Sequence, residues 1–104
     1  MIYTVPTTKA KQFLSENPYI VASDEGEAIA LACGEYLVRG EKATVVMGEN
    51  GFLNALDAII TLSQLHEIPI DLKIYLREDE PQHAMAAKGV RQILDIYQIT
   101  AEIL

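Results

Sequence analysis

Three carboxylates open an otherwise apolar, alanine-rich stretch of the chain, and a glycine lies among them. In DEGEAIALACGEYL (residues 24–37), Gly26 separates Glu25 from Glu27 and Asp24 precedes them. Asp24 is a favourable N-cap residue, and Glu27 stands where a capping-box side chain reaches back toward the cap. Acids in the first turn also complement the helix dipole. Spacing alone therefore explains these residues as a well-made helix start.

Gly26 does not fit that structural interpretation comfortably. A glycine in place of alanine inside a helix costs up to ~1 kcal/mol, so its use suggests that another group approaches the backbone there. Helix N-termini beyond strand ends are also where open α/β sheets bind ligands. Whether one of the acids faces a ligand is a question that the spacing leaves open.

Other side chains capable of chemistry are few. Cys33 is the only cysteine, so an intrachain disulfide is excluded, and its place on the apolar side of the helix predicts a small buried thiol. His83 lies in the polar segment REDEPQH (77–83), which we expect to be a loop, and His66 is expected to be exposed near a helix end. No His/Cys metal spacing and no phosphate-binding glycine loop ending in Lys-Ser/Thr occurs, so we expect no metal ligands here.

Length and charge limit the classes of protein that remain. The 104 residues are enough for one domain, 1–104, with one core. The net charge of −7 argues against a nucleic-acid or membrane-surface partner, because both attract the opposite balance. No basic-then-apolar leader opens the chain and no apolar run approaches ~20 residues, so a cytoplasmic location is expected.

Strand-like and helix-like segments alternate along the chain. The expected strands are IYTV (2–5), YIVA (19–22), ATVVM (43–47), IDLKIYL (70–76) and AEIL (101–104), and the expected helices cover 7–17, 24–39, the segment after Gly51 and 85–97. Gly48 and Gly51 are expected to form a turn. The alternation predicts an α/β fold, with a mostly parallel sheet of about five strands and helices on both faces in three α/β/α layers.

The segment Ile70–Leu76 has the alternating pattern of a strand with one wet face. Covered parallel strands are instead unbroken apolar runs. We therefore expect either an edge strand or a strand whose usual cover is absent, in which case its apolar face would need a partner chain.

Two long segments resemble a known family. They are DEGEAIALACGEYLVRGEKATVVMGENGFLNALDAI and EIPIDLKIYLREDEPQHAMAAKGVRQILDIYQITAEIL. They resemble the pyrimidine-binding domain of thiamine-diphosphate-dependent decarboxylases, and within these the phosphonopyruvate and sulfopyruvate decarboxylases. The matching pieces are Glu-Gly-Glu-Ala at the helix start and Asp-Glu-Pro-Gln-His further on. The resemblance implies a shortened form of that domain's fold.

The resemblance also implies roles for particular residues. Glu25 would hydrogen-bond a ring nitrogen of the cofactor's aminopyrimidine, and Gly26 would let the ring edge approach. Gly51 and Asn54 match the family's turn and helix start beside the cofactor. Glu27 would be only a partner of the cap.

Three further residues would lie on the substrate side: His83, Glu49 and Asn50. The family has Gln-Asn-Ser where this chain has Gly48, Glu49 and Asn50. The extra acid at position 49 would disfavour a dianionic phosphonate or sulfonate nearby. Leu53 also replaces a family glycine.

The family binds the cofactor's diphosphate and Mg²⁺ on a different domain that carries a Gly-Asp-Gly stretch, and no such site exists in this chain. The resemblance therefore implies the small subunit of a split 2-oxo-acid decarboxylase, inactive alone. A separate diphosphate-binding subunit would share the thiamine diphosphate, Mg²⁺ would bind only through that partner, and the enzyme would be a homo- or hetero-oligomer.

Two other functions stay open. The chain could be a non-catalytic dimerising or regulatory domain that keeps the fold without binding the cofactor. The shortness of the chain and the changes at residues 48–50 favour this alternative. It could also be a receiver-like signalling domain. Against that, no acidic pair follows the first strand, and Met47 occupies the approximate place of the phosphorylatable aspartate.

Overall fold

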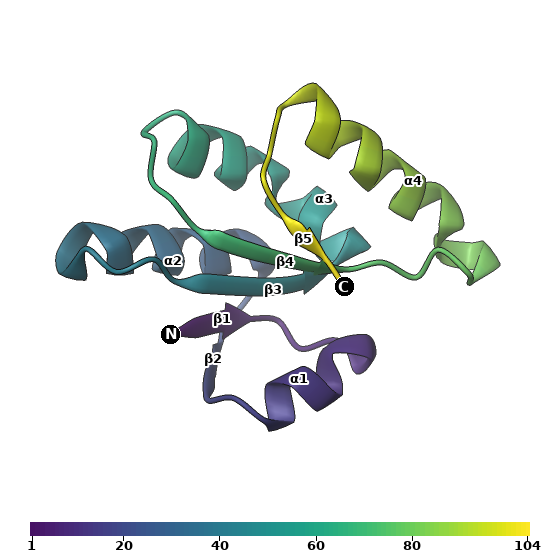
Figure 1. The fold of residues 1–104 in the computed structure, drawn as a ribbon, viewed down its shortest axis with the longest axis horizontal. Coiled ribbons are helices and arrows are strands. Elements are labelled where there is room, and N and C mark those ends of the chain that lie inside the picture. The colour runs from purple at the N-terminus through teal and green to yellow at the C-terminus, as the bar shows by residue number, and fades with distance from the viewer.

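Five parallel strands form one sheet in the computed structural model, which describes all 104 residues (Figure 1). The strands are β1 (Ile2–Thr4), β2 (Tyr19–Val21), β3 (Thr44–Gly48), β4 (Asp71–Tyr75) and β5 (Glu102–Ile103), in the spatial order β2-β1-β3-β4-β5. The helices are a 3₁₀ turn (Thr8–Ala10), α1 (Lys11–Ser15), α2 (Glu25–Arg39), α3 (Glu49–Ala58) with a π-helical continuation (Ile59–Gln64), and α4 (Pro81–Ile96). The predicted α/β class and parallel five-stranded sheet are confirmed.

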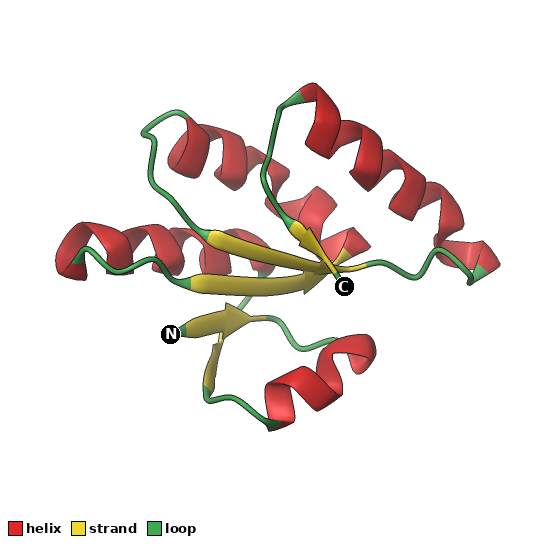
Figure 2. Ribbon diagram, in the orientation of Figure 1, coloured by secondary structure: helices red, strands yellow, loops and turns green.

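The sheet grows in two directions from β1. The chain passes from β1 outward to β2, then returns across β1 to β3 and continues to β4 and β5. Because parallel crossovers are right-handed, this reversal puts α1 on one face and α2, α3 and α4 on the other, as Figure 2 shows. The predicted three layers are therefore present, and the carboxyl ends of β1 and β3 mark the point where the connections diverge.

The main core lies between the sheet and the three-helix layer. It is a cluster of 18 buried side chains, which includes Phe52 and Ile29 from the helices and Val45 and Ile74 from the strands. Cys33 belongs to it, so the buried thiol is confirmed, and burial raises the pKa of that thiol. A much smaller cluster of Ala10, Leu14 and Val46 lies under α1 on the opposite face.

The alternating segment predicted at residues 70–76 is strand β4, which is neither an edge strand nor in need of a partner chain. β4 is paired on both sides, with β3 and β5, so it is not an edge strand. Its apolar side chains Leu72, Ile74 and Leu76 are buried in the chain's own core, so the prediction that this face needs a partner chain is wrong. The wet face arises because α1 is short and does not extend over Asp71 and Lys73, which are half-buried.

Two predicted boundaries are also corrected. Residues 48–51 do not form a turn: β3 ends at Gly48, α3 begins at Glu49, and Gly51 lies in the first helical turn. The polar loop is shorter than expected because α4 begins at Pro81, a residue whose fixed φ suits the first turn of a helix. His83 is therefore a helical residue.

The ends of α2 are closed as the sequence predicts. Asp24 Oδ1 accepts a hydrogen bond from the Glu27 backbone N–H at 2.8 Å, and the Glu27 carboxylate accepts from the backbone N–H and hydroxyl of Ser23, each at 2.9 Å. Gly40 ends the helix in the left-handed conformation, with φ of 71°. Asp24 and Glu27 are thus occupied by capping, and Glu25 takes no part in it.

A polar contact joins β1 to the middle of α2. The Tyr3 hydroxyl donates to Glu35 Oε1 at 2.8 Å, and Tyr3 itself is buried. This hydrogen bond is the main cause that lowers the pKa of Glu35 below its ordinary value.

No helix in the structure combines the length and apolar character that crossing a bilayer requires.

Replacing the cap residue tests the account of the α2 start. We expect Asp24→Ala to lower the free energy of unfolding by about 1 kcal/mol, because the Glu27 N–H loses its acceptor. Asp79→Ala, at an exposed turn residue, is the matched control and should change stability by less than about 0.5 kcal/mol. Urea unfolding followed by circular dichroism measures both, and equal effects would contradict the capping assignment.

The Tyr3–Glu35 contact predicts a pH-dependent stability. A carboxyl whose pKa is lowered on folding stabilises the protein above its ordinary pKa, and the contribution is lost as pH falls through the lowered value. Tyr3→Phe should therefore destabilise the chain at neutral pH, and the difference from wild type should shrink below a pH of about 4.3. Thermal unfolding across that range, with Tyr97→Phe as the exposed control, measures it; a pH-independent difference would count against the assignment.

Candidate functional site

A small crevice lies at the carboxyl ends of β1 and β3, where the sheet reverses its direction of growth. Its volume is about 210 Å³. The residues that line it come from the segment after β1, the starts of α2 and α3, and the segment after β4: Val5, Pro6, Thr7, Glu25, Gly48, Asn50, Gly51, Asn54 and Arg77. In open α/β sheets this is the position at which ligands bind.

Glu25 owes its position to the absence of a side chain at residue 51. It is the first residue of α2, and its side chain lies across the first turn of α3. A Cβ built on Gly51 would stand 2.7 Å from Glu25 Cγ, closer than real Cβ atoms approach, and 3.2 Å from Glu25 Cδ, which is tighter than most real contacts. Any other residue at position 51 would therefore push the carboxylate aside.

The Glu25 carboxylate keeps most of its hydrogen-bonding capacity free. Its one side-chain partner is Asn54 Nδ2, which donates to Oε1 over a long 3.4 Å. The neighbouring Glu27 uses both of its oxygens in the cap. A half-buried carboxylate with spare acceptor sites can bind a donor, or share a proton with a basic ring nitrogen.

An ion pair closes the crevice on the β4 side. The strand register places Gly48 opposite Tyr75, so the residues that follow each strand end, Glu49 and Arg77, come together. Arg77 Nε donates to Glu49 Oε1 at 2.9 Å, and His83 Nδ1, from the first turn of α4, lies 3.3 Å from the same oxygen. The Glu49 side chain is fully buried, and its Oε2 is a buried oxygen without a partner.

The structure brings together four of the residues singled out from the sequence. Glu25, Asn50, Gly51 and Asn54 all line the crevice. Gly51 lies there for a reason different from the turn that was expected, because it accommodates the Glu25 side chain.

The other three predicted site residues do not line the crevice. Glu49 is buried and paired with Arg77, so it is not an exposed acid, and His83 Nδ1 approaches the same Glu49 oxygen as Arg77 does. Gly26 is half-buried at the second position of α2, and a Cβ there would meet only Asp24 Oδ1, at 3.3 Å.

Arg77 is the main residue that the sequence analysis missed. It was included in a polar loop, whereas the structure places it in the crevice as the only cation among the lining residues. Its position two residues after the end of β4 is a usable signal, because the carboxyl ends of parallel strands share one edge of a sheet. Thr7 was also missed; its hydroxyl caps the 3₁₀ turn by accepting from the Ala10 N–H at 3.3 Å.

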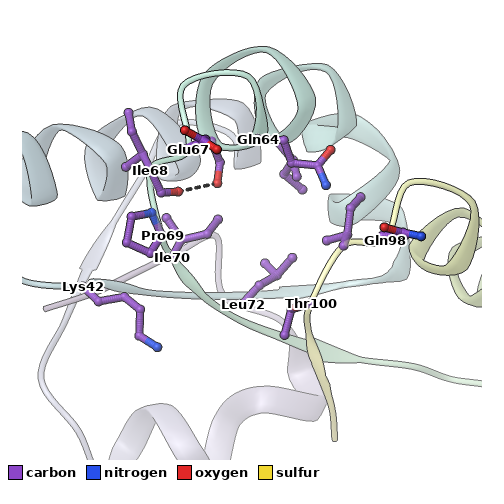
Figure 3. Close-up of a pocket in the computed structure, with 12 residues that line it drawn as sticks. Lys42, Gln64, Glu67, Ile68, Pro69, Ile70, Leu72, Gln98 and Thr100 are labelled. Atoms are coloured by element: carbon purple, nitrogen blue, oxygen red, sulfur yellow. Dashed lines mark hydrogen bonds between the residues drawn. The ribbon is translucent and has the colours of Figure 1, made fainter.

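A larger hollow at the opposite end of the sheet has a different character. Its volume is about 400 Å³, and Figure 3 shows Lys42, Ile70, Leu72 and Thr100 among the residues around it. Aliphatic and amide side chains make up most of its lining, and none of the crevice residues belongs to it. No group of three or more His, Cys, Asp or Glu side chains in the chain is placed to hold a metal ion.

Comparison of the sequence with those of known proteins identifies a related protein. No protein-family model matches the chain. Among curated proteins, the chain is 30% identical over 108 aligned positions to the sulfopyruvate decarboxylase subunit alpha of Methanocaldococcus jannaschii. The alignment covers 94% of this chain and 63% of that protein, so the chain spans less than two thirds of the relative's length. The chain is therefore related in sequence to a decarboxylase subunit.

Proposed function

We propose that this chain is the small, pyrimidine-binding subunit of a thiamine-diphosphate-dependent decarboxylase of 2-oxo acids. Residues 1–104 would form a single pyrimidine-binding domain of the phosphonopyruvate and sulfopyruvate decarboxylase type. A separate diphosphate-binding subunit would complete the site. The observation that carries the proposal is a half-buried Glu25 carboxylate, with unused acceptor capacity, at the switch point of the sheet.

The residues present fit the aminopyrimidine end of the cofactor. A ring nitrogen that takes up or shares a proton needs a carboxylate beside it, and Glu25 has spare acceptor sites. Gly51 has no side chain, so Glu25 Cγ and Cδ can lie against the first turn of α3. Gly26 does not line the crevice, so the fit rests on Glu25 and Gly51.

The chemistry is divided between the cofactor and the chain. Bound thiamine diphosphate would supply the electron sink that decarboxylation of a 2-oxo acid requires. Glu25 holds a proton at the ring nitrogen, and Asn54 Nδ2 orients the carboxylate from one side. Val5 and Pro6, after β1, form the apolar part of the crevice wall.

The size of the crevice supports a shared site. Complete small-molecule sites usually enclose about 300–1,000 Å³. The crevice of about 210 Å³ falls below that range, as expected if a second surface closes it. The related protein is itself named as a subunit, and Mg²⁺ would be held together with the diphosphate by the partner.

Substitution of Glu25 tests the proposal directly. The chain is co-expressed with the product of a neighbouring reading frame that carries a Gly-Asp-Gly sequence, and CO₂ release is measured with thiamine diphosphate, Mg²⁺ and a panel of 2-oxo acids. Glu25→Gln should reduce turnover at least ~100-fold, because an amide cannot hold the proton at the ring nitrogen. Glu27→Gln is the matched control, because it stands two residues away in the same turn and serves only the cap.

Two outcomes would contradict the proposal. If Glu25→Gln releases CO₂ as fast as wild type, Glu25 has no part in the reaction. If calorimetry detects no binding of thiamine diphosphate to the chain together with any such partner, the chain is a non-catalytic dimerising or regulatory domain.

Gly51 provides a second, independent test. Gly51→Ala places a methyl group where Glu25 Cγ lies, so we expect a loss of about 1–3 kcal/mol in stability or a displaced Glu25, and in either case weaker cofactor binding. Gly89→Ala, also inside a helix but with no atom within 4 Å of the built Cβ, should keep cofactor binding and stabilise the fold by up to ~1 kcal/mol. Thermal unfolding and calorimetry measure both variants; unchanged cofactor affinity in Gly51→Ala would show that the Glu25 position does not matter.

A further inference from the structure

The crevice contains a guanidinium group whose hydrogen-bonding capacity the protein leaves mostly unused. Arg77 has five N–H donors, and its side chain makes one hydrogen bond in the structure, from Nε to Glu49. The side chain is one third exposed and lines the crevice together with Glu25. Its terminal amino groups therefore have no protein acceptor.

The partner of Arg77 is held in a way that a purely structural ion pair would not favour. An arginine–carboxylate pair gains most when two parallel N–H groups bind both carboxylate oxygens. Here Arg77 Nε and His83 Nδ1 both approach Oε1 of Glu49, and Oε2 is buried without a partner. Burying a charged carboxylate with one oxygen unsatisfied is costly, so stability alone does not account for the arrangement.

Glu49 lies where it can hold the Arg77 side chain in one orientation. Glu49 is the first residue of α3, where the helix dipole stabilises an anion, and it is fixed by the strand that precedes it. Glu49 accepts one hydrogen bond from Arg77, and Arg77 donates it from Nε. The planar fork of the two terminal amino groups is thus left free for a second carboxylate.

We infer that Arg77 is the receptor for the carboxylate group of a small organic acid and that buried Glu49 is its positioning residue. Arg77 is the only cation among the lining residues, so it is the one group there that attracts an anion. That the acid is a 2-oxo acid rests on the proposed function, whereas the binding of a carboxylate does not. The crevice, of about 210 Å³, has room for a short acid beside Arg77.

The test is a binding measurement on the chain by itself, with pyruvate as the probe and without cofactor or second subunit. In ¹⁵N-labelled protein, pyruvate should shift the Arg77 Nε–H resonance with millimolar affinity, whereas chloride at equal ionic strength should not. Arg77→Gln should weaken pyruvate binding by at least about tenfold, a change of 1.4 kcal/mol. Arg77→Lys should lose nearly as much, because an ammonium group lacks the fork. Arg39→Gln, at the far end of α2, is the control and should bind normally.

Two Glu49 variants of similar size separate positioning from structure. Glu49→Gln keeps an acceptor for Arg77 Nε and should retain pyruvate binding. Glu49→Leu removes the acceptor and should weaken binding at least about fivefold, with a changed Arg77 Nε–H resonance in the unliganded protein. Simple electrostatics predicts the opposite, because losing the Glu49 charge would strengthen anion binding. Equal or tighter binding by a folded Glu49→Leu chain would therefore overturn the positioning role.

Failure of this inference can be told apart from failure of the proposed function. If pyruvate leaves the Arg77 resonance unchanged, or if Arg77→Gln binds pyruvate normally, Arg77 is not the receptor, whatever the decarboxylation assay gives. If Arg77 binds pyruvate while Glu25→Gln leaves CO₂ release intact, the receptor stands and the cofactor role of Glu25 falls.

Discussion

A parallel sheet that grows in both directions from one strand must leave a gap between the connections that diverge there, and side chains at that gap face a ligand instead of a helix. In this chain the gap lies at the carboxyl ends of β1 and β3. The close approach of Glu25 to the bare backbone at Gly51 decides what the gap can do, because it sets an acid against the first turn of α3. The rest of the site is arranged around that contact.

Two acids near the crevice have opposite environments, and their roles follow from the difference. Glu25 is half-buried and has one long hydrogen bond, so it can exchange a proton or bind a donor. Glu49 is fully buried and forms an ion pair with Arg77, so it holds a neighbouring side chain in place. The Glu49 carboxylate is therefore paired with Arg77, and the crevice wall carries the Arg77 guanidinium.

Much of the fold could be predicted from local patterns. The alternation of strands and helices, the caps of α2 and the burial of Cys33 depend on spacing over a few residues, and the structure confirms them. The errors arose where local patterns are ambiguous. Glycines at 48 and 51 suggested a turn, but Gly51 lies in a helix, where its missing side chain leaves room for Glu25. We expected a loop over residues 77–83, but α4 begins within this segment, at Pro81. Proline suits the first turn of a helix as well as it suits a loop.

The sequence by itself determined the α/β class and the helix start at Asp24, because caps and periodicity are properties of neighbouring residues. Spacing left the role of Glu25 open, and only the family resemblance singled that residue out. Only the tertiary structure decided that Glu25 lies over Gly51 and that Arg77 meets Glu49. These pairs are 26 and 28 residues apart along the chain, and the order and register of parallel strands bring them together. The order of the strands depends on contacts between residues far apart in the chain, so the spacing within any one segment does not give it.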